Sequence, residues 1–270
     1  MFWPKAALAS CFVQELHTSF TARFPSCKGP HGDLIAEVAS DSIARLQGSS
    51  ALYHDAEHTM LVVLAGQQIL IGRHEAEPLE PDDWMHAVLS FLLHDIGFTA
   101  GACQGDHGRL RVIDGGGASI ELPRGASDAF VQPHHVARGQ LHVRERFAAC
   151  AHIDAERLAR NIGRTLFPVP TGEPAAESAT EAGLVRAADL IGQLADPSYL
   201  SKTMALYCEL RECGMASAAG YDTPADIRER YPEFFRCSVE PYLGPALEHL
   251  RRTEEGQHWI ALLYRHLDAS

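Results

Sequence analysis

Apolar residues recur at spacings of three and four along most of this 270-residue chain, which is the spacing of one face of an α-helix. The segments with this pattern are 5–23, 32–47, 52–73, 82–95, 133–150, 154–165, 179–195, 197–213, 241–252 and 255–267. Residues 100–130 interrupt the pattern with Gly115-Gly116-Gly117, Ile120, Leu122 and Pro123, which predicts a long loop with room for a short hairpin. The pattern therefore predicts an all-α protein with one long loop, and a flexible connection from Pro168 to Thr180.

Three of the predicted helices carry side chains of the kinds that bind metal ions. His54 and His58 are four residues apart, so that a helix places both on one face. His94-Asp95 ends an apolar run, and Asp189 lies in a segment with few other charges. A lone helical histidine is more often a surface or hydrogen-bonded core residue. A buried carboxylate, however, needs a cation or several donors to offset its loss of hydration, and one metal would satisfy all three segments.

The order of these residues resembles that of the HD-domain metal-dependent phosphohydrolase superfamily, in which a His, a His-Asp pair and a distant Asp bind metal. The resemblance implies that His58, His94, Asp95 and Asp189 are metal ligands. It covers about residues 50 to 200. It therefore divides the chain into N-terminal helices (1–48), an HD metal-binding core (49–200) and a C-terminal helical extension packed on that core (201–270).

One branch of the superfamily is closer in its motifs. The segment from Tyr53 to His58 is similar to the Tyr-His-Asn-x-x-His signature of the class I cyclic-nucleotide phosphodiesterases, and Ala188-Asp189-Leu190 is similar to their Ala-Asp-Leu segment. This likeness implies that His54 is the general acid.

The chain departs from that branch at two positions. Asp55 stands where the phosphodiesterases have Asn, and Phe98 stands where they have a further His, which puts their second metal or its water in question here. Their purine-binding Gln has no assigned equivalent, although Gln193, one turn beyond Asp189, would face the same pocket. Cyclic nucleotides are therefore one candidate substrate among others.

The expected chemistry explains the residue types. A phosphate ester repels hydroxide, so hydrolases use cations to neutralise the phosphoryl oxygens and to lower the pKa of bound water from about 15.7 toward 7. We expect a metal-bound hydroxide as nucleophile and a proton from His54 for the leaving alkoxide, since imidazole has a pKa near 6.5. Imidazole and carboxylate ligands suit one or two ions of Zn, Mn, Mg or Fe without selecting among them.

A second group of candidates follows the long loop. Pro133 can open a helix that presents His135, Arg138 and His142 at spacings of three and four. Of these, His135 is the best candidate for an additional metal ligand, and Arg138 can bind a substrate phosphate with two hydrogen bonds. The alternative, that these residues lie on a solvated face, fits the sequence equally well.

Composition excludes several classes of function. The net charge is −12, with 23 basic and 35 acidic residues, whereas a nucleic-acid-binding protein needs a basic face. No apolar run reaches the length of about 18 residues that a membrane span requires. Leu8-Ala9-Ser10-Cys11 matches a lipoprotein cleavage pattern but lacks the apolar stretch before it.

The 7 cysteines show no C-x-x-C spacing. We therefore expect a cytoplasmic protein with reduced thiols.

The C-terminal region is rich in aromatic residues, namely Tyr221, Tyr231, Phe234, Phe235, Tyr242, Trp259 and Tyr264. Aromatic side chains at helical positions are more often part of the core than of a binding surface, because each buries a large area. The alternatives are that they line the substrate pocket or form a contact in a homodimer.

The sequence thus predicts an all-α HD-domain metallophosphohydrolase, expected to act as a phosphodiesterase on a nucleotide-like small-molecule phosphate ester. The first alternative is an HD-fold di-iron oxygenase, in which extra histidines such as His135 bind iron. The second alternative is a non-catalytic metal-dependent sensor.

Overall fold

A computed structural model describes residues 4–170 and 175–267 of the chain. The elements of its first part are α1 (Pro4–Arg23), α2 (His31–Gln47), α3 (Ala56–Ala76), α4 (Pro81–Leu93), η1 (Ile96–Phe98), β1 (Leu110–Val112), β2 (Ser119–Glu121), η2 (Asp128–His134), α5 (His135–Phe147) and α6 (Ala155–Gly163). Those of its second part are η3 (Ala175–Ala179), α7 (Glu181–Leu194), α8 (Tyr199–Glu212), α9 (Met215–Ala218), α10 (Pro224–Glu229), α11 (Tyr231–Phe234), the π-helical η4 (Phe235–Val239), η5 (Glu240–Tyr242), α12 (Gly244–Leu250) and α13 (Glu254–Arg265).

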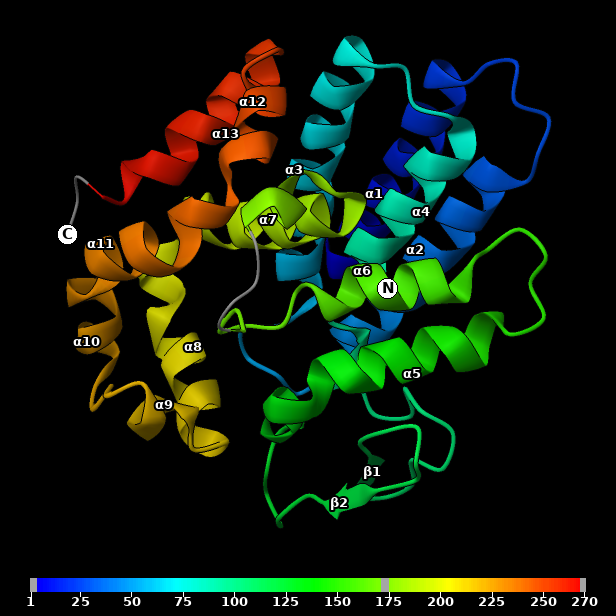
Figure 1. Ribbon diagram of the computed structural model, residues 1–270. Helices are drawn as coiled ribbons and strands as arrows, with labels where there is room; N and C mark the ends of the chain where they lie inside the picture. Colours follow the sequence, from blue (N-terminus) through cyan, green and yellow to red (C-terminus); the bar gives the residue numbers. More distant parts are fainter. Residues whose placement is uncertain (1–3, 171–174, 268–270) are drawn as a thin grey trace.

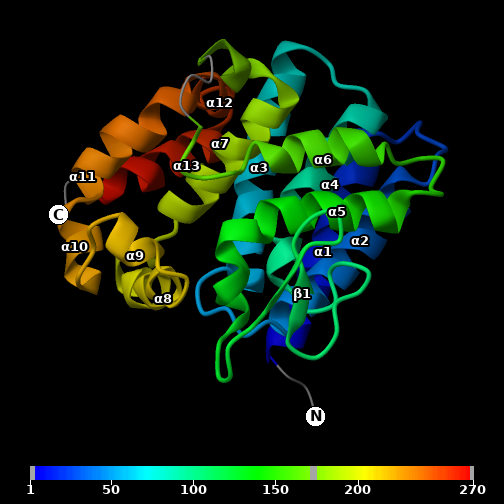
Figure 2. The same cartoon turned by 60° about the horizontal axis from the view of Figure 1, so that its bottom comes forward.

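Helices α3 and α7 form the centre of the molecule (Figure 1). Helices α1, α2 and α4 lie on one side of this pair, and α12 and α13 pack on it from the other side. Helices α5 and α6 pack together, and the long loop with its strands lies beyond α5 (Figure 2). The predicted all-α class is confirmed.

The hairpin expected within residues 100–130 is present. Strands β1 and β2 pair antiparallel, with Leu110 opposite Glu121 and Val112 opposite Ser119. The predicted connection from Pro168 to Thr180 contains η3, but its residues 171–174 lie outside the described part of the chain.

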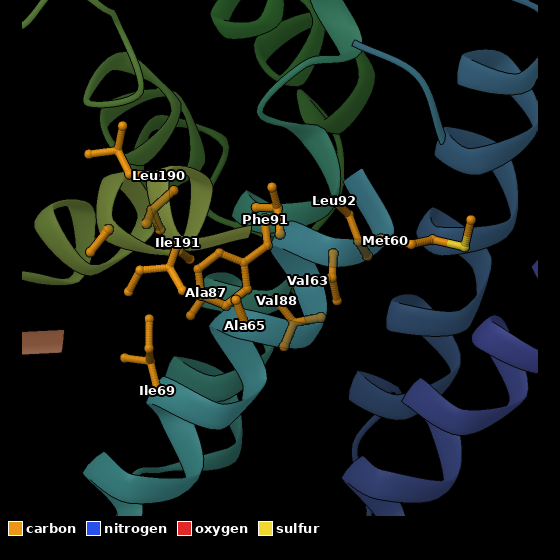
Figure 3. Packing of buried hydrophobic residues seen from close by; sticks show 14 of the residues in the cluster. Met60, Val63, Ala65, Ile69, Ala87, Val88, Phe91, Leu92, Leu190 and Ile191 are labelled. Carbon is orange, nitrogen blue, oxygen red and sulfur yellow. The ribbon is translucent and has the colours of Figure 1, made fainter. Parts of the chain in front are cut away.

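The central core is built from apolar side chains of α3, α4 and α7. In Figure 3 the ring of Phe91 points toward Ala65 and Ile191, and all three side chains are fully buried. The ring takes the space above Gly66, where an added Cβ would lie 2.4 Å from it. This packing brings the three helices that carry the candidate ligands together. The C-terminal Tyr231, Phe235 and Trp259 are also buried, as core residues.

The helix boundaries next to the candidate ligands differ from the predicted ones. Helix α3 begins at Ala56 because Asp55 caps it, accepting hydrogen bonds from the backbone N–H groups of Glu57 (2.9 Å) and His58 (3.1 Å). The expectation that His54 lies on this helix is therefore wrong, since His54 precedes the cap. Helix α4 ends at Leu93, so that His94 and Asp95 form the turn into η1.

Four short elements after residue 213 were not predicted. Helices α9, α10 and α11 and the π-helical η4 have 4, 6, 4 and 5 residues. Segments of this length are too short to show a helical period, and tertiary packing stabilises them instead. No helix in the described ranges is both long and apolar enough to span a membrane.

Gly192 allows α7 to approach α3 closely, and this contact gives a test of the fold. A Cβ at Gly192 would lie 2.6 Å from the Cα of Val62. Alanine favours helices by about 1 kcal/mol over glycine, but we expect overpacking to outweigh this gain, so that Gly192→Ala lowers the free energy of unfolding by about 1–3 kcal/mol. Gly244→Ala is the control, because a Cβ at Gly244 meets no atom within 4 Å. Equal denaturant midpoints for the two variants would contradict this close approach.

Candidate metal centre

Three buried residues from two helix termini form a cluster of ligand atoms. His58 comes from the first turn of α3, and His94 and Asp95 follow the end of α4. One ligand atom from each residue lies within 4.8 Å of the others. The Nε2 atoms of His58 and His94 are 3.3 Å apart, and Asp95 Oδ2 lies 3.4 Å from the first and 3.2 Å from the second. The sequence predicted that these residues meet, and the structure brings them together.

Asp189 approaches the cluster from α7. Its Oδ1 atom lies 3.3 Å from His58 Nε2 and 3.6 Å from His94 Nε2. The Asp189 side chain is 18% exposed, whereas that of Asp95 is 4% exposed, so Asp189 is the ligand candidate closest to solvent. The four predicted ligands therefore lie together at the place where α3, α4 and α7 meet.

The donor set fits a divalent cation. His94 Nδ1 is hydrogen-bonded to the carbonyl of Phe91 at 2.8 Å, which turns its Nε2 toward the cluster, as the second contact of a metal-binding histidine does. Asp95 Oδ2 is buried, and among the described residues it has no hydrogen-bond partner of good geometry, although two imidazole nitrogens lie within 3.4 Å of it. Two imidazoles and two carboxylates that converge in this way are typical ligands for Zn, Mn or Fe.

The charges in the cluster shift the pKa values of the two histidines in the metal-free state. Burial lowers the pKa of His58, but its contacts with Asp189 and Asp95 outweigh burial and raise the pKa to about 9. Burial also lowers the pKa of His94, whereas Asp95 and Asp189 raise it. The carboxylates again prevail, and the pKa of His94 is about 9. Burial raises the pKa of Asp95, but His94 and the other nearby histidines together lower it by more. The pKa of Asp95 therefore lies well below its usual value. Protons thus supply the positive charge that the carboxylates need when no cation is bound.

His54 lies beside the cluster and is held by a residue that sequence reasoning missed, Glu209 of α8. The His54 Nδ1 atom is 2.5 Å from Glu209 Oε2, while Glu209 Oε1 accepts from the backbone N–H groups of Tyr53 (2.7 Å) and His54 (3.3 Å). Glu209 is 1% exposed. Burial lowers the pKa of His54, and the Glu209 carboxylate more than offsets this and raises it. A buried glutamate needs donors of this kind, but its burial is visible only in the structure, so no signal in the sequence identified this partner.

Phe98 occupies the space between two histidines. Its ring stacks on His54 with centroids 4.7 Å apart and on His135 with centroids 4.6 Å apart. The Phe98 ring therefore fixes the planes of its two neighbours.

His135 faces the cluster from the start of α5. Its Nδ1 atom is hydrogen-bonded to the carbonyl of Gln132 at 2.6 Å, and its Nε2 atom lies 3.8 Å from Asp95 Oδ1. Burial lowers the pKa of His135 more than Asp95 raises it. A neutral imidazole with Nε2 toward a carboxylate is suited to hold an additional cation.

The other two predicted residues of α5 do not join His135 at the cluster. The helix itself starts at His135 rather than at Pro133, which lies within η2. The structure places Arg138 outside the lining of the cavity beside the cluster: its side chain is 0% exposed and bonds Asp106 at 2.9 Å and the carbonyl of Gly97 at 2.7 Å. Arg138 thus fastens the long loop to the core. His142 Nδ1 contacts the carbonyl of Ala102 at 2.6 Å, away from the cluster.

A cavity of about 290 Å³ opens beside the metal cluster. Its lining includes His54, Asp95, His135, Asp189 and Gln193. Gln193 therefore lines the same pocket as Asp189, as its position one turn later predicted. The remaining walls come largely from α8 to α11, so the C-terminal region contributes both core residues and pocket residues.

The fold and the site define an all-α protein with a candidate metal centre beside a pocket. The chain belongs to the Npun_R2479-like family, whose model matches residues 2–269. Comparison with curated proteins and with solved structures gives no match. Arguments about function therefore depend on the geometry and chemistry of the site.

Metal binding should release protons, because a ligating imidazole must be neutral while His58 and His94 have pKa values of about 9 without metal. We expect about two protons to be released per Zn²⁺ at pH 7.5. Calorimetric titration in two buffers of different ionisation enthalpy measures this number. In the metal-free protein the raised pKa values stabilise the fold fully below pH ~6.5, and this contribution is lost as the pH rises through about 9. Metal binding without proton release would contradict the ligand assignment.

Removing either carboxylate should weaken metal binding. We expect Asp95→Ala and Asp189→Ala to lose the rise in melting temperature that added Zn²⁺ or Mn²⁺ gives the unsubstituted protein, since ligands stabilise the state that binds them. Asp114→Ala, in an exposed turn of the long loop, is the matched control and should keep that rise. Full metal occupancy in both Asp95→Ala and Asp189→Ala, measured by elemental analysis, would refute this site.

Proposed function

We propose that this protein is a metal-dependent phosphoric ester hydrolase that acts on a small molecule. The observation that carries the proposal is the position of His54, held by Glu209 at 2.5 Å and lining the same cavity as Asp95 and Asp189. The order of the ligands and the resemblance to HD-domain phosphohydrolases support it.

His58, His94, Asp95 and Asp189 would hold the cation. A bound divalent ion would supply Lewis-acid stabilisation of the phosphoryl group and lower the pKa of a water molecule. The side chains around it have a simpler task, which is to bind the ester, to exclude bulk water and to deliver a proton.

His54 has the properties of a general acid. Burial lowers its pKa, but Glu209 outweighs burial and raises it, which favours the protonated imidazole that a general acid needs. Because Nδ1 bonds Glu209, the other nitrogen, Nε2, is the one available to protonate a leaving oxygen. The stacked ring of Phe98 holds the plane of the imidazole. Glu209 acts through His54 and is therefore a positioning residue.

A second candidate function is that of a di-iron oxygenase. The observation that favours it is His135, whose Nε2 atom lies 3.8 Å from Asp95 Oδ1 and adds a third imidazole beside the cluster. Metal analysis of protein purified without added metal separates the two functions. Two irons with dioxygen consumption favour the oxygenase, whereas Zn, Mn or Mg with hydrolysis of bis-p-nitrophenyl phosphate favours the hydrolase.

We also infer a cytoplasmic location. All seven cysteines are free thiols, as in proteins of reducing compartments.

Substitution of His54 tests the proposed hydrolase. We expect His54→Ala to keep its metal and to lose roughly 10²- to 10⁴-fold in turnover of an alkyl ester, the usual contribution of a positioned proton donor. The loss should be much smaller for a p-nitrophenyl ester, because p-nitrophenolate leaves without a proton. Equal losses on both esters, or loss of metal, would reject His54 as the general acid.

Glu209→Gln tests how His54 is controlled. The amide retains the shape of Glu209 but removes the charge that raises the pKa of His54. As the pH rises, the variant should therefore lose activity at a lower pH than the unsubstituted enzyme does. The basic limb of its pH–activity profile should shift to lower pH. Glu212→Gln is the matched control on the same helix, because Glu212 bonds Ser127 instead. An unchanged pH–activity profile for Glu209→Gln would show that Glu209 does not control the pKa of His54.

A further inference from the structure

The side chains that line the cavity are poorly suited to a ligand with several negative charges. Among the described residues that line it, the ionisable side chains are two acids, two histidines and two tyrosines, and there is no lysine or arginine. A nucleoside di- or triphosphate brings several negative charges, and proteins usually neutralise them with arginine or lysine. The chain's net charge of −12 adds to this mismatch.

Much of the remaining cavity lining is apolar. Thr165, Tyr199, Tyr221 and Ser238 add hydroxyl groups to it. The aliphatic and aromatic side chains from α7 to α11 are Leu190, Leu206, Leu210, Met215, Ile227 and Phe234. A ligand that fills this space gains mainly from the removal of apolar surface from water.

The amides in the lining have partners within the protein. Gln193 is hydrogen-bonded to Tyr199, and Gln132 Oε1 lies 3.6 Å from the thiol of Cys213. Each amide thus has one of its hydrogen-bonding groups occupied within the protein.

From this arrangement we propose that the substrate is an ester with a single phosphoryl group and an apolar alkyl or aryl group, rather than a nucleotide. This inference rests on the proposed hydrolase function. The phosphoryl group would lie at the cluster and the apolar group against α8 to α11. In hydrolysis the oxygen of water joins phosphorus and one of its protons passes to solvent. The ester P–O bond breaks, and the departing alcohol oxygen takes a proton from His54.

Binding of alkylphosphonates to the metal-loaded protein tests the substrate class without any need for turnover. Calorimetry should show that octylphosphonate binds at least about ten-fold more tightly than butylphosphonate, since each fully buried methylene contributes up to about four-fold. ATP should bind more weakly than octylphosphonate. Met215→Ala should reduce the gain from the longer chain, while Met204→Ala, which removes a 58% exposed side chain of α8, should not.

Parallel hydrolysis assays separate the two proposals. Both proposals are supported if the protein hydrolyses bis-p-nitrophenyl phosphate and octyl phosphate. The kcat/KM for octyl phosphate should then be at least about ten-fold above that for methyl phosphate. Turnover with equal binding of butyl- and octylphosphonate, or with tighter binding of ATP, overturns the apolar substrate and leaves the hydrolase. Chain-length-dependent binding without hydrolysis of any ester overturns the hydrolase.

Discussion

Asp95 is 2% exposed and lies between the Nε2 atoms of His58 and His94, and a carboxylate in this position requires positive charge nearby. The surrounding structure is arranged around that requirement. Asp55 caps α3 and so sets the position of His58, while the contact of His94 with the carbonyl of Phe91 turns the other imidazole inward. Gly192 lets α7 come close enough to α3 for Asp189 to reach the same point. A cation satisfies these groups, and without one the raised pKa values of the histidines let protons do so.

Much of this centre could be predicted from the sequence, because helical periodicity and the order of the ligands depend on short spacings. The four predicted ligands meet as expected. The position of His54 was predicted less well: the sequence placed it on the helix of His58, but that helix begins at Ala56 with Asp55 as its cap, so that His54 precedes it. A capping residue and a first-turn residue differ only in backbone geometry, which periodicity does not resolve.

The parts that could not be predicted depend on contacts between distant segments. Glu209 reaches His54 across 155 positions, and Arg138 reaches Asp106 across the hairpin loop. From the sequence alone, Arg138 had the residue type and spacing of a phosphate-binding group, and only its burial shows that it holds the loop instead. Part of the apolar cavity wall likewise comes from the short helices α9 to α11, which have no recognisable period. Residue type thus identified the candidate metal site, whereas tertiary packing defines the pocket beside it.

The most direct test of a metal centre is to locate the ion. Crystals of the protein grown with Mn²⁺ and measured at a wavelength with strong manganese anomalous scattering would show where it binds. The account predicts a peak among His58 Nε2, His94 Nε2, Asp95 Oδ2 and Asp189 Oδ1, at bonding distances of about 2.0–2.3 Å. A fully occupied peak elsewhere, with these four side chains unligated, would contradict it.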